Sequence, residues 1–343
     1  MGLATCTIVE STFGKHGARY IASIIFAVNL IGWFGINNGE CALAFSNFLQ
    51  SQYGIEISYY LSCLIWGVIM TLTAVYGVSA IEKLDVVGIP LLMAIMVVGT
   101  FMAIQIHGIE AIHHPVEETM SFIDGVALSF NFYACGAIMQ SDMTRYQKSR
   151  RDTVLSTFIG VFPLGIITML LGGMMTKIAN EYDISMVLIS VGIPVLGILS
   201  LVISTWTTNV TNAYMGALDV VKIFNVPDHR RREVTIAVGL VGTVLGMVGI
   251  LDAMMPFLAF LAYLVCPIGG VMFADYFVLG KGKPENWHSR EGFHWIGVVT
   301  WGISAVLAYL VRLEFSGIGF AVIIYLVLTK CIPQTNKIGG GLT

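Results

Sequence analysis

Long apolar runs separated by short polar stretches follow one another along almost the whole chain. A helix that crosses the roughly 30 Å hydrocarbon core of a bilayer needs about 20 apolar residues. Ten runs predict such helices, over residues 17–48, 56–79, 84–106, 119–146, 152–178, 184–222, 233–251, 253–279, 292–313 and 315–332. The pattern therefore predicts an all-α integral membrane protein with about ten transmembrane helices.

The polar connections between these runs are short, and none is a low-complexity or Gly/Ser-rich linker. We therefore expect a single polytopic membrane domain over residues 1–343. Residues 1–16 would be a lead-in and residues 333–343 a tail. The segment that follows Met1 lacks the apolar core of a secretory signal peptide.

Composition agrees with a membrane environment. The chain is 56% hydrophobic and 11% charged, whereas a soluble domain carries about 25% charged residues. Its six cysteines show no metal-ligand spacing, and most fall inside apolar runs. We interpret these cysteines as small packing residues.

The basic residues predict the orientation in the membrane. All but two of the 18 Lys and Arg residues fall in the lead-in, the tail and alternate connections, the exceptions being Lys177 and Arg312. Because basic loops stay in the cytoplasm, we expect a multi-pass protein of the plasma or inner membrane with both termini cytoplasmic. The run 184–222 is long enough to include a cytoplasmic turn.

Polar side chains within the first run lie on one helical face. Asn29, Trp33, Asn37 and Glu40 are spaced by four, four and three residues. A charge at the membrane centre costs about 2.5 to 3.5 kcal/mol on insertion scales, so this face is expected to point into the bundle. It could line a binding site, or it could be a packed interface with amide hydrogen bonds between helices.

The fourth run mixes small, polar and aromatic residues at its middle, namely Asn131, Phe132, Tyr133, Cys135 and Gly136. This mixture suggests a helix interrupted at mid-membrane, whose free backbone groups could bind a polar solute or a cation. No proline enforces a break there, so an uninterrupted helix is the alternative.

The sixth run contains STWTTNVTNAY at residues 204–214. The hydroxyls of Thr207 and Thr208, with helix carbonyls one turn earlier near Ser204, are hard oxygen donors that suit a small alkali cation such as sodium. Alternatively, these hydroxyls bond back to the preceding turn and only bend the helix.

Other chemistry is not indicated. The sequence has neither an HExxH run nor a GxSxG elbow, and nothing suggests a nucleic-acid site. The HGIEAIHHPVEE stretch is interpreted as an interfacial loop rather than a metal site. We expect a protein that is not an enzyme, binds no cofactor and resides in a lipid bilayer.

Five short motifs resemble the cytosine permease branch of the nucleobase-cation symporter family. They are TFGKHG at 12–17, GWFG at 32–35, DMTRY at 142–146, WTTN at 206–209 and CPIGGVMFADY at 266–276. Their order and spacing are similar to the family over nearly the whole chain. The resemblance implies a leucine-transporter-type bundle of inverted repeats, in which the ten runs correspond to family helices three to twelve.

The resemblance also implies secondary active import of a nucleobase, cytosine first, by sodium- or proton-coupled symport with alternating access. Trp33 and Tyr133 would stack on the two faces of the base. The implied substrate site comprises Asn29, Trp33, Asn37, Phe132, Tyr133, Gly136, Asn209 and Asn212, and the implied sodium site comprises Ser204, Thr207 and Thr208.

Several positions depart from the family pattern, among them Cys135 in place of a serine, Cys266 in place of a proline and Glu10 in place of a basic residue. Leu30 stands where cytosine permeases tend to carry glutamine, Tyr133 where phenylalanine is usual, and Glu40 where an apolar residue is common. A purine, a hydantoin or another amide-bearing ring is therefore an alternative substrate. The two unmatched family helices leave a non-transporting scaffold or sensor of the same fold as the other alternative, and a membrane-embedded enzyme is the weakest reading.

Overall fold

The computed structural model describes residues 2–113, 120–181 and 183–332, and the regular structure of these residues is helical. The predicted tail at 333–343 lies outside the described residues, as does the start of the fourth run at 119. The helices are α1 (Thr5–Ile8), α2 (Glu10–Gly17), α3 (Ser23–Tyr53), α4 (Tyr59–Val75), α5 (Val78–His107), α6 (Phe122–Met139), α7 (Ser141–Thr144), α8 (Arg150–Leu155), α9 (Phe162–Ala179), α10 (Ile184–Ser190), α11 (Pro194–Phe224), α12 (Arg231–Met247), α13 (Met254–Phe273), α14 (Trp295–Val311) and α15 (Ser316–Cys331).

Short π-helical turns join several of these helices into longer rods. The turn η1 (Ala18–Ala22) links α2 to α3, η3 (Ser156–Val161) links α8 to α9, and η6 (Ala274–Leu279) extends α13. Within the described residues, six helices are long and apolar enough to cross a membrane. They are Glu10–Tyr53, Val78–His107, Phe122–Thr144, Arg150–Ala179, Pro194–Phe224 and Ile250–Leu279. Three shorter apolar helices, α4, α14 and α15, accompany them, so the all-α multi-pass prediction is confirmed.

The sixth run differs from its prediction. It divides into α10 and α11 near its N-terminal end instead of turning near its cytoplasmic end. Gly192 adopts a φ of 84°, and Ile193, which precedes Pro194, is not helical. A residue before proline is pushed out of the helical region, so the break falls here and α11 continues without interruption for 31 residues.

The fourth run is also unlike the expectation of an interrupted helix. α6 is continuous from Phe122 to Met139, and the bend to α7 comes only at Gln140. Gly136 does not take a positive φ, and the helix contains no proline. Its backbone groups therefore stay paired within the helix, and the predicted mid-membrane break is wrong.

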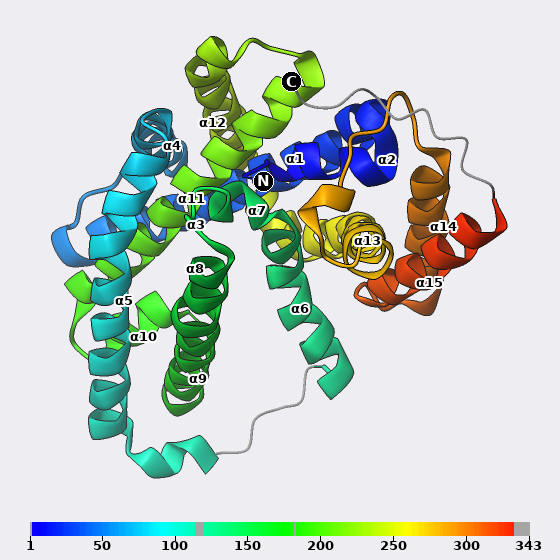
Figure 1. Ribbon diagram of the computed structural model, residues 1–343. Coiled ribbons are helices and arrows are strands. Elements are labelled where there is room, and N and C mark those ends of the chain that lie inside the picture. The colour runs from blue at the N-terminus through cyan, green and yellow to red at the C-terminus, as the bar shows by residue number, and fades with distance from the viewer. Residues whose placement is uncertain (1, 114–119, 182, 333–343) are drawn as a thin grey trace.

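The helices pack around a central pair, α3 and α11, whose contact is the most extensive in the described part of the chain. α4 and α12 pack against α3, while α5 contacts both α9 and α11. α14 and α15 lie together against α13, on the side away from α5 and α9 (Figure 1). This arrangement puts the polar faces of α3 and α11 at the centre of the molecule.

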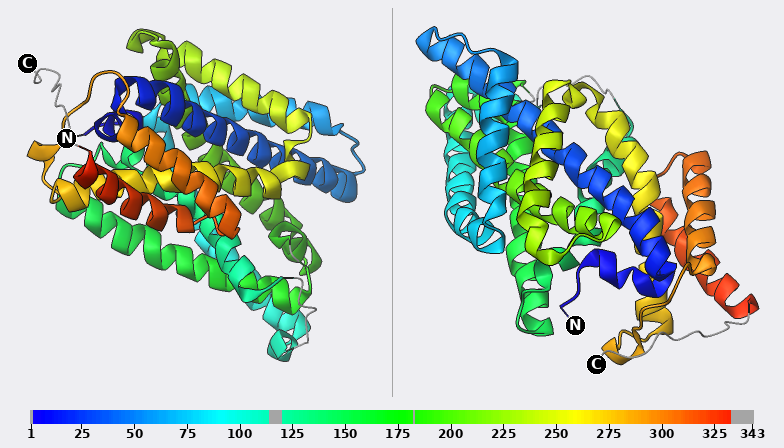
Figure 2. Two further views of the ribbon diagram at one scale, coloured as in Figure 1. Left: turned by 90° about the vertical axis from the view of Figure 1, so that its right-hand side faces the viewer. Right: turned by 90° about the horizontal axis from the view of Figure 1, so that it is seen from above.

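Basic residues from distant segments meet at one end of the bundle. Arg19 donates to the Ile223 carbonyl at 2.7 Å, Arg150 donates to the Gly282 carbonyl at 2.6 Å, and Lys222 pairs with Glu10. The N-terminal helices, the 280–294 connection and the end of α15 lie at this same end (Figure 2, left). We call it the basic end.

Candidate functional site

Three asparagine amides meet where α3 crosses α11. The Nδ2 atoms of Asn37 and Asn212 each donate to Oδ1 of Asn209 at 3.3 Å. Asn209 donates in turn to the Phe34 carbonyl at 3.0 Å and is fully buried. Within the described residues, the side-chain oxygens of Asn37 and Asn212 accept no hydrogen bond. The cluster therefore has acceptors available for a ligand that carries N–H groups.

An aromatic pair lies one helical turn from this cluster. Trp33 on α3 and Phe132 on α6 have ring centroids 5.6 Å apart and planes inclined by 54°. Tyr133, which the resemblance assigns to the second face of a base, is 57% exposed. The structure therefore brings Phe132, and not Tyr133, to Trp33.

The side chain of Asn29, on α3, points to α6 and not to the amide cluster. Its Nδ2 is 3.9 Å from the sulfur of Met139, and its side chain is 2% exposed. The side-chain oxygens of Asn29 and Asn131 are buried, and neither has a partner among the described residues. Gly136, further along α6, is exposed, and a Cβ added there would meet no atom within 4 Å. The structure thus separates Asn29 and Gly136 from the three amides.

The hydroxyls assigned to a cation converge on one carbonyl. Thr207 and Thr208 donate to the carbonyl of Ser204 at 3.0 and 2.8 Å, and the Ser204 hydroxyl donates to Leu201 at 3.0 Å. This is the back-bonded geometry of the alternative interpretation. Each hydroxyl oxygen keeps lone pairs for a cation while its proton is donated. Thr208 is exposed, and the methyl group of Thr207 faces Gly88 of α5.

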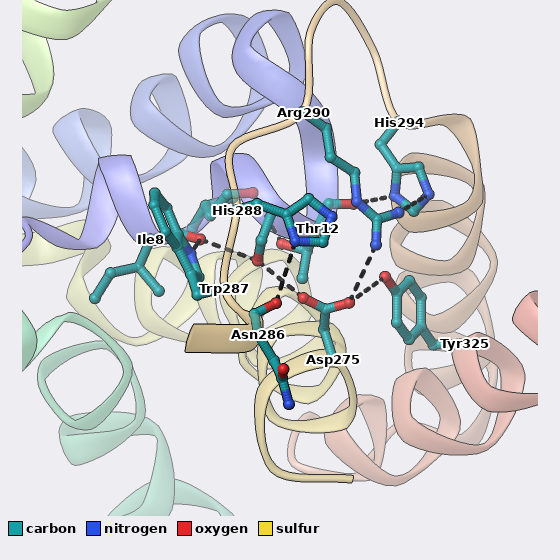
Figure 3. A network of polar contacts seen from close by, with 11 residues as sticks. Ile8, Thr12, Asp275, Asn286, Trp287, His288, Arg290, His294 and Tyr325 are labelled. Carbon is teal, nitrogen blue, oxygen red and sulfur yellow. Dashed lines mark hydrogen bonds and ion pairs between the residues drawn. The ribbon is translucent and has the colours of Figure 1, made fainter. Parts of the chain in front are cut away.

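Sequence reasoning did not anticipate a polar network at the basic end (Figure 3). Arg290 lies between Asp275 and His294, and the Tyr325 hydroxyl donates to Asp275 at 2.9 Å. Trp287 donates to the carbonyl of Ile8 at 3.1 Å. The TFGKHG and ADY sequences were recognised as motifs, but they gave no sign that they meet in space.

Amide and aromatic side chains on the central helices of a membrane bundle indicate a site for a polar solute, and the permease family that the chain matches makes it a transporter rather than an enzyme. Residues 1–340 match the family described as permease for cytosine/purines, uracil, thiamine and allantoin, and the chain belongs to that family. The cytosine permease of Escherichia coli strain K12 is 23% identical over 310 residues, which cover 89% of this chain and 71% of that protein. The cytosine permease of Escherichia coli O157:H7 has the same identity and coverage.

Solved structures give the fold. Mhp1, a nucleobase-cation-symport-1 family transporter, in a closed conformation with bromovinylhydantoin bound, superimposes with a TM-score of 0.76 at 18% identity. The match covers 96% of this chain and 79% of that one. Inward-facing Mhp1 gives a TM-score of 0.74 at 17% identity, over 95% and 76%. The fold is thus of the leucine-transporter type, as the resemblance implied.

Proposed function

We propose that this protein is a secondary active transporter that imports a nucleobase, cytosine first, by symport with sodium or protons and by alternating access. One observation carries the proposal. The buried amides of Asn37, Asn209 and Asn212 meet one helical turn from the Trp33–Phe132 pair, inside a bundle of the permease family.

These groups suit a planar heterocycle. Trp33 would stack on one face of the base, and Phe132 or Tyr133 would cover the other. The acceptors of Asn37 and Asn212 would receive the N–H groups of the base edge. Asn29 and Gly136, which lie apart from the three amides, would border the site only on the side of the Trp33–Phe132 pair. A hydantoin or a purine is the second candidate substrate, because bromovinylhydantoin is bound in the solved Mhp1 structure and the family description includes purines.

The coupling ion would bind beside this site on α11. Thr207, Thr208 and the neighbouring Ser204 offer oxygens for sodium, and the remaining ligands would come from other parts of the site. Cation binding that orders α11 would raise substrate affinity, and by linkage the substrate would raise cation affinity.

The whole chain, residues 1–343, would form one transport domain in the cell membrane. The basic end would face the cytoplasm, together with both termini. Positive loops are disfavoured in translocation, and the contacts between basic segments at one end of the bundle support this orientation.

Uptake of radiolabelled cytosine in cells that lack nucleobase transporters tests the proposal, with sodium and external pH varied separately. Gradient-dependent uptake that falls at least about fivefold in Asn37→Ala is expected, since a lost hydrogen bond with an unpaired buried partner costs about 1 to 3 kcal/mol. Asn47→Ala is the matched control, because Asn47 is exposed on the same helix. Correctly inserted protein that takes up neither cytosine, purines nor hydantoins would refute transport of this class.

A further inference from the structure

The helix α2 is built to pair with a distant loop. Gly14 has φ 74° and ψ 166°, so the backbone leaves the helical path within the TFGKHG motif. The amides of Lys15 and His16 then donate to the carbonyls of Arg290 and Gly292 at 2.8 and 2.9 Å. A Cβ at Gly14 would overlap the Gly292 carbonyl, and a positive φ is itself unfavourable for other residues. Glycine is required here for the pairing.

Two backbone bonds run in the opposite direction. The amide of His294 donates to the Phe13 carbonyl at 2.8 Å, and the amide of Arg290 donates to the Glu10 carbonyl at 3.3 Å. Four amides, two on each segment, are therefore protected only while residues 289–294 lie along α2.

Side chains extend this pairing to the central helices. Glu10 is 6% exposed, pairs with Lys222 of α11 and accepts from the Ser289 hydroxyl at 2.6 Å. The hydroxyl of Ser11 donates to Asp275 at 2.9 Å. Because α2 continues through η1 into α3, these contacts fix the helix of Trp33 to α11 and to η6.

His294 is neutral in this arrangement. Its Nδ1 lies 2.8 Å from the Thr12 carbonyl, which can only accept, so Nδ1 carries the proton. Its Nε2 is then a lone pair facing the guanidinium of Arg290 (Figure 3). A second proton on Nε2 would remove this acceptor and place two positive charges in contact.

The surroundings of His294 favour the neutral form. Burial lowers its pKa and the Arg290 charge lowers it further, while the Thr12 carbonyl and Asp275 act in the opposite direction. The titratable and charged groups on the elements around it are Glu10, Lys15 and His16 of α2, Lys222 of α11, Asp275 of η6, Arg290 and Glu291 of the loop, and Tyr325 of α15.

We propose that residues 287–294 form a clamp that holds α2 against α11, η6 and α15, and that a proton taken up by His294 releases it. The clamp itself rests on its contacts alone. Its consequence for import, a dependence of transport on the pH at the basic end, rests on the proposed function.

The sign of the pH effect follows from linkage. A histidine whose pKa is lowered in the closed clamp binds fewer protons closed than open. The closed clamp is therefore fully stabilised above the ordinary histidine pKa of about 6.5 and is weakened as the pH falls below it. The equilibrium constant for opening the clamp would rise at low pH by up to about tenfold for each unit by which the pKa of His294 is lower in the closed state than in the open state.

Hydrogen–deuterium exchange on the purified chain in lipid nanodiscs measures how well the clamp protects its amides, independently of any transport assay. Peptides covering residues 10–17 and 287–297 would be followed from about pH 8 to about pH 5.5, with correction for the intrinsic pH dependence of amide exchange. In the natural protein, protection of both peptides is expected to fall together as the pH is lowered. In His294→Gln, which keeps a donor and an acceptor but does not titrate, protection is expected to stay constant.

His288→Gln is the matched control, because His288 lies in the same loop and contacts only the Asn286 carbonyl among the described polar groups. It should retain the pH response. Arg290→Gln, which removes the opposing charge but leaves His294 buried, should weaken the response and serves as the second variant if His294→Gln does not fold. A flat response in the natural protein, or an unchanged one in both variants, would overturn the proposal. Loss of nucleobase uptake with an intact exchange response would instead count against the proposed function.

Discussion

At the residue scale, the distance between Trp33 and Phe132 indicates what the site must do to bind. A base stacked between two rings needs about 7 Å between them, twice the roughly 3.5 Å contact distance of carbon atoms. The ring centroids are 5.6 Å apart and the ring planes are inclined by 54°, so the two rings leave no room for a base between them. To hold a planar substrate between both rings, the site would have to widen and the two ring planes would have to become parallel. To hold it against Trp33 alone, Phe132 would only have to leave the face of Trp33.

Replacement of Trp33 by alanine should therefore remove stacking while leaving the amide cluster in place. Stacking of a base on an aromatic side chain contributes about 1 to 3 kcal/mol, so the KM for uptake should rise by about five- to hundredfold. Trp33→Phe should recover much of this loss. Trp295→Ala serves as the control, because Trp295 is 63% exposed on α14. Equal effects of the two alanine substitutions would contradict a stacking role for Trp33.

Thr208 tests the coupling ion. Its hydroxyl bonds back to Ser204 as many helical threonines do, so only a change in ion dependence separates a ligand from a structural residue. Thr208→Ala should raise the sodium concentration needed for half-maximal uptake, and Thr208→Ser should restore it because the oxygen returns. Thr157→Ala is the control, since Thr157 makes the same type of bond to Thr153 in the exposed η3 segment. Unchanged sodium dependence in Thr208→Ala would favour proton coupling.

At the scale of helices, α4 and α12 interlock through small residues. A Cβ at Gly67 would overlap the Thr243 hydroxyl, and a Cβ at Gly239 would overlap the Thr71 hydroxyl. Each helix thus presents a threonine to a glycine on the other. Close backbone approach of this kind is how membrane helices gain dispersion contacts when both are surrounded by apolar solvent.

Gly67→Ala should therefore destabilise the bundle by about 1 to 3 kcal/mol, the usual range for overpacking. Thermal unfolding in detergent would show a lower midpoint. Adding Thr243→Ala should recover part of the loss, because it removes the two nearest atoms and leaves the Thr243 Cβ at 2.9 Å. Gly302→Ala is the control, since nothing lies within 4 Å of a Cβ there. A double variant no more stable than Gly67→Ala would contradict this packing.

The helices themselves were predictable because the bilayer fixes their length. The runs 84–106 and 152–178 became helices at Val78–His107 and Arg150–Ala179. The break at Gly192 escaped prediction because it lies inside an apolar run, where hydropathy does not register it. The choice of Phe132 over Tyr133 depends on the rotation of α6 against α3, which spacing within one helix cannot give. The clamp joins residues far apart in sequence, and periodicity contains no information about such a pairing.

At the scale of the whole molecule, orientation is the property on which import depends. Arg150 begins the span Arg150–Ala179 at the basic end, so Lys177, in the last turn of α9, lies near the opposite end of that span. Lys283 lies in the connection at the basic end itself. If the basic end is cytoplasmic, Lys177→Cys should react with a membrane-impermeant maleimide in intact cells. Lys283→Cys should react only after permeabilisation.

The natural cysteines make this labelling readable. Of the six, only Cys331 is exposed, and it ends α15 at the basic end. Both variants would be made in Cys331→Ser, and the natural protein would show whether Cys331 itself is shielded in intact cells. Labelling of Lys283→Cys from outside would mean that the basic end faces the external medium and that the orientation is the reverse of the one proposed. His294 would then meet the external medium, and acidification outside the cell, rather than inside it, would release the clamp.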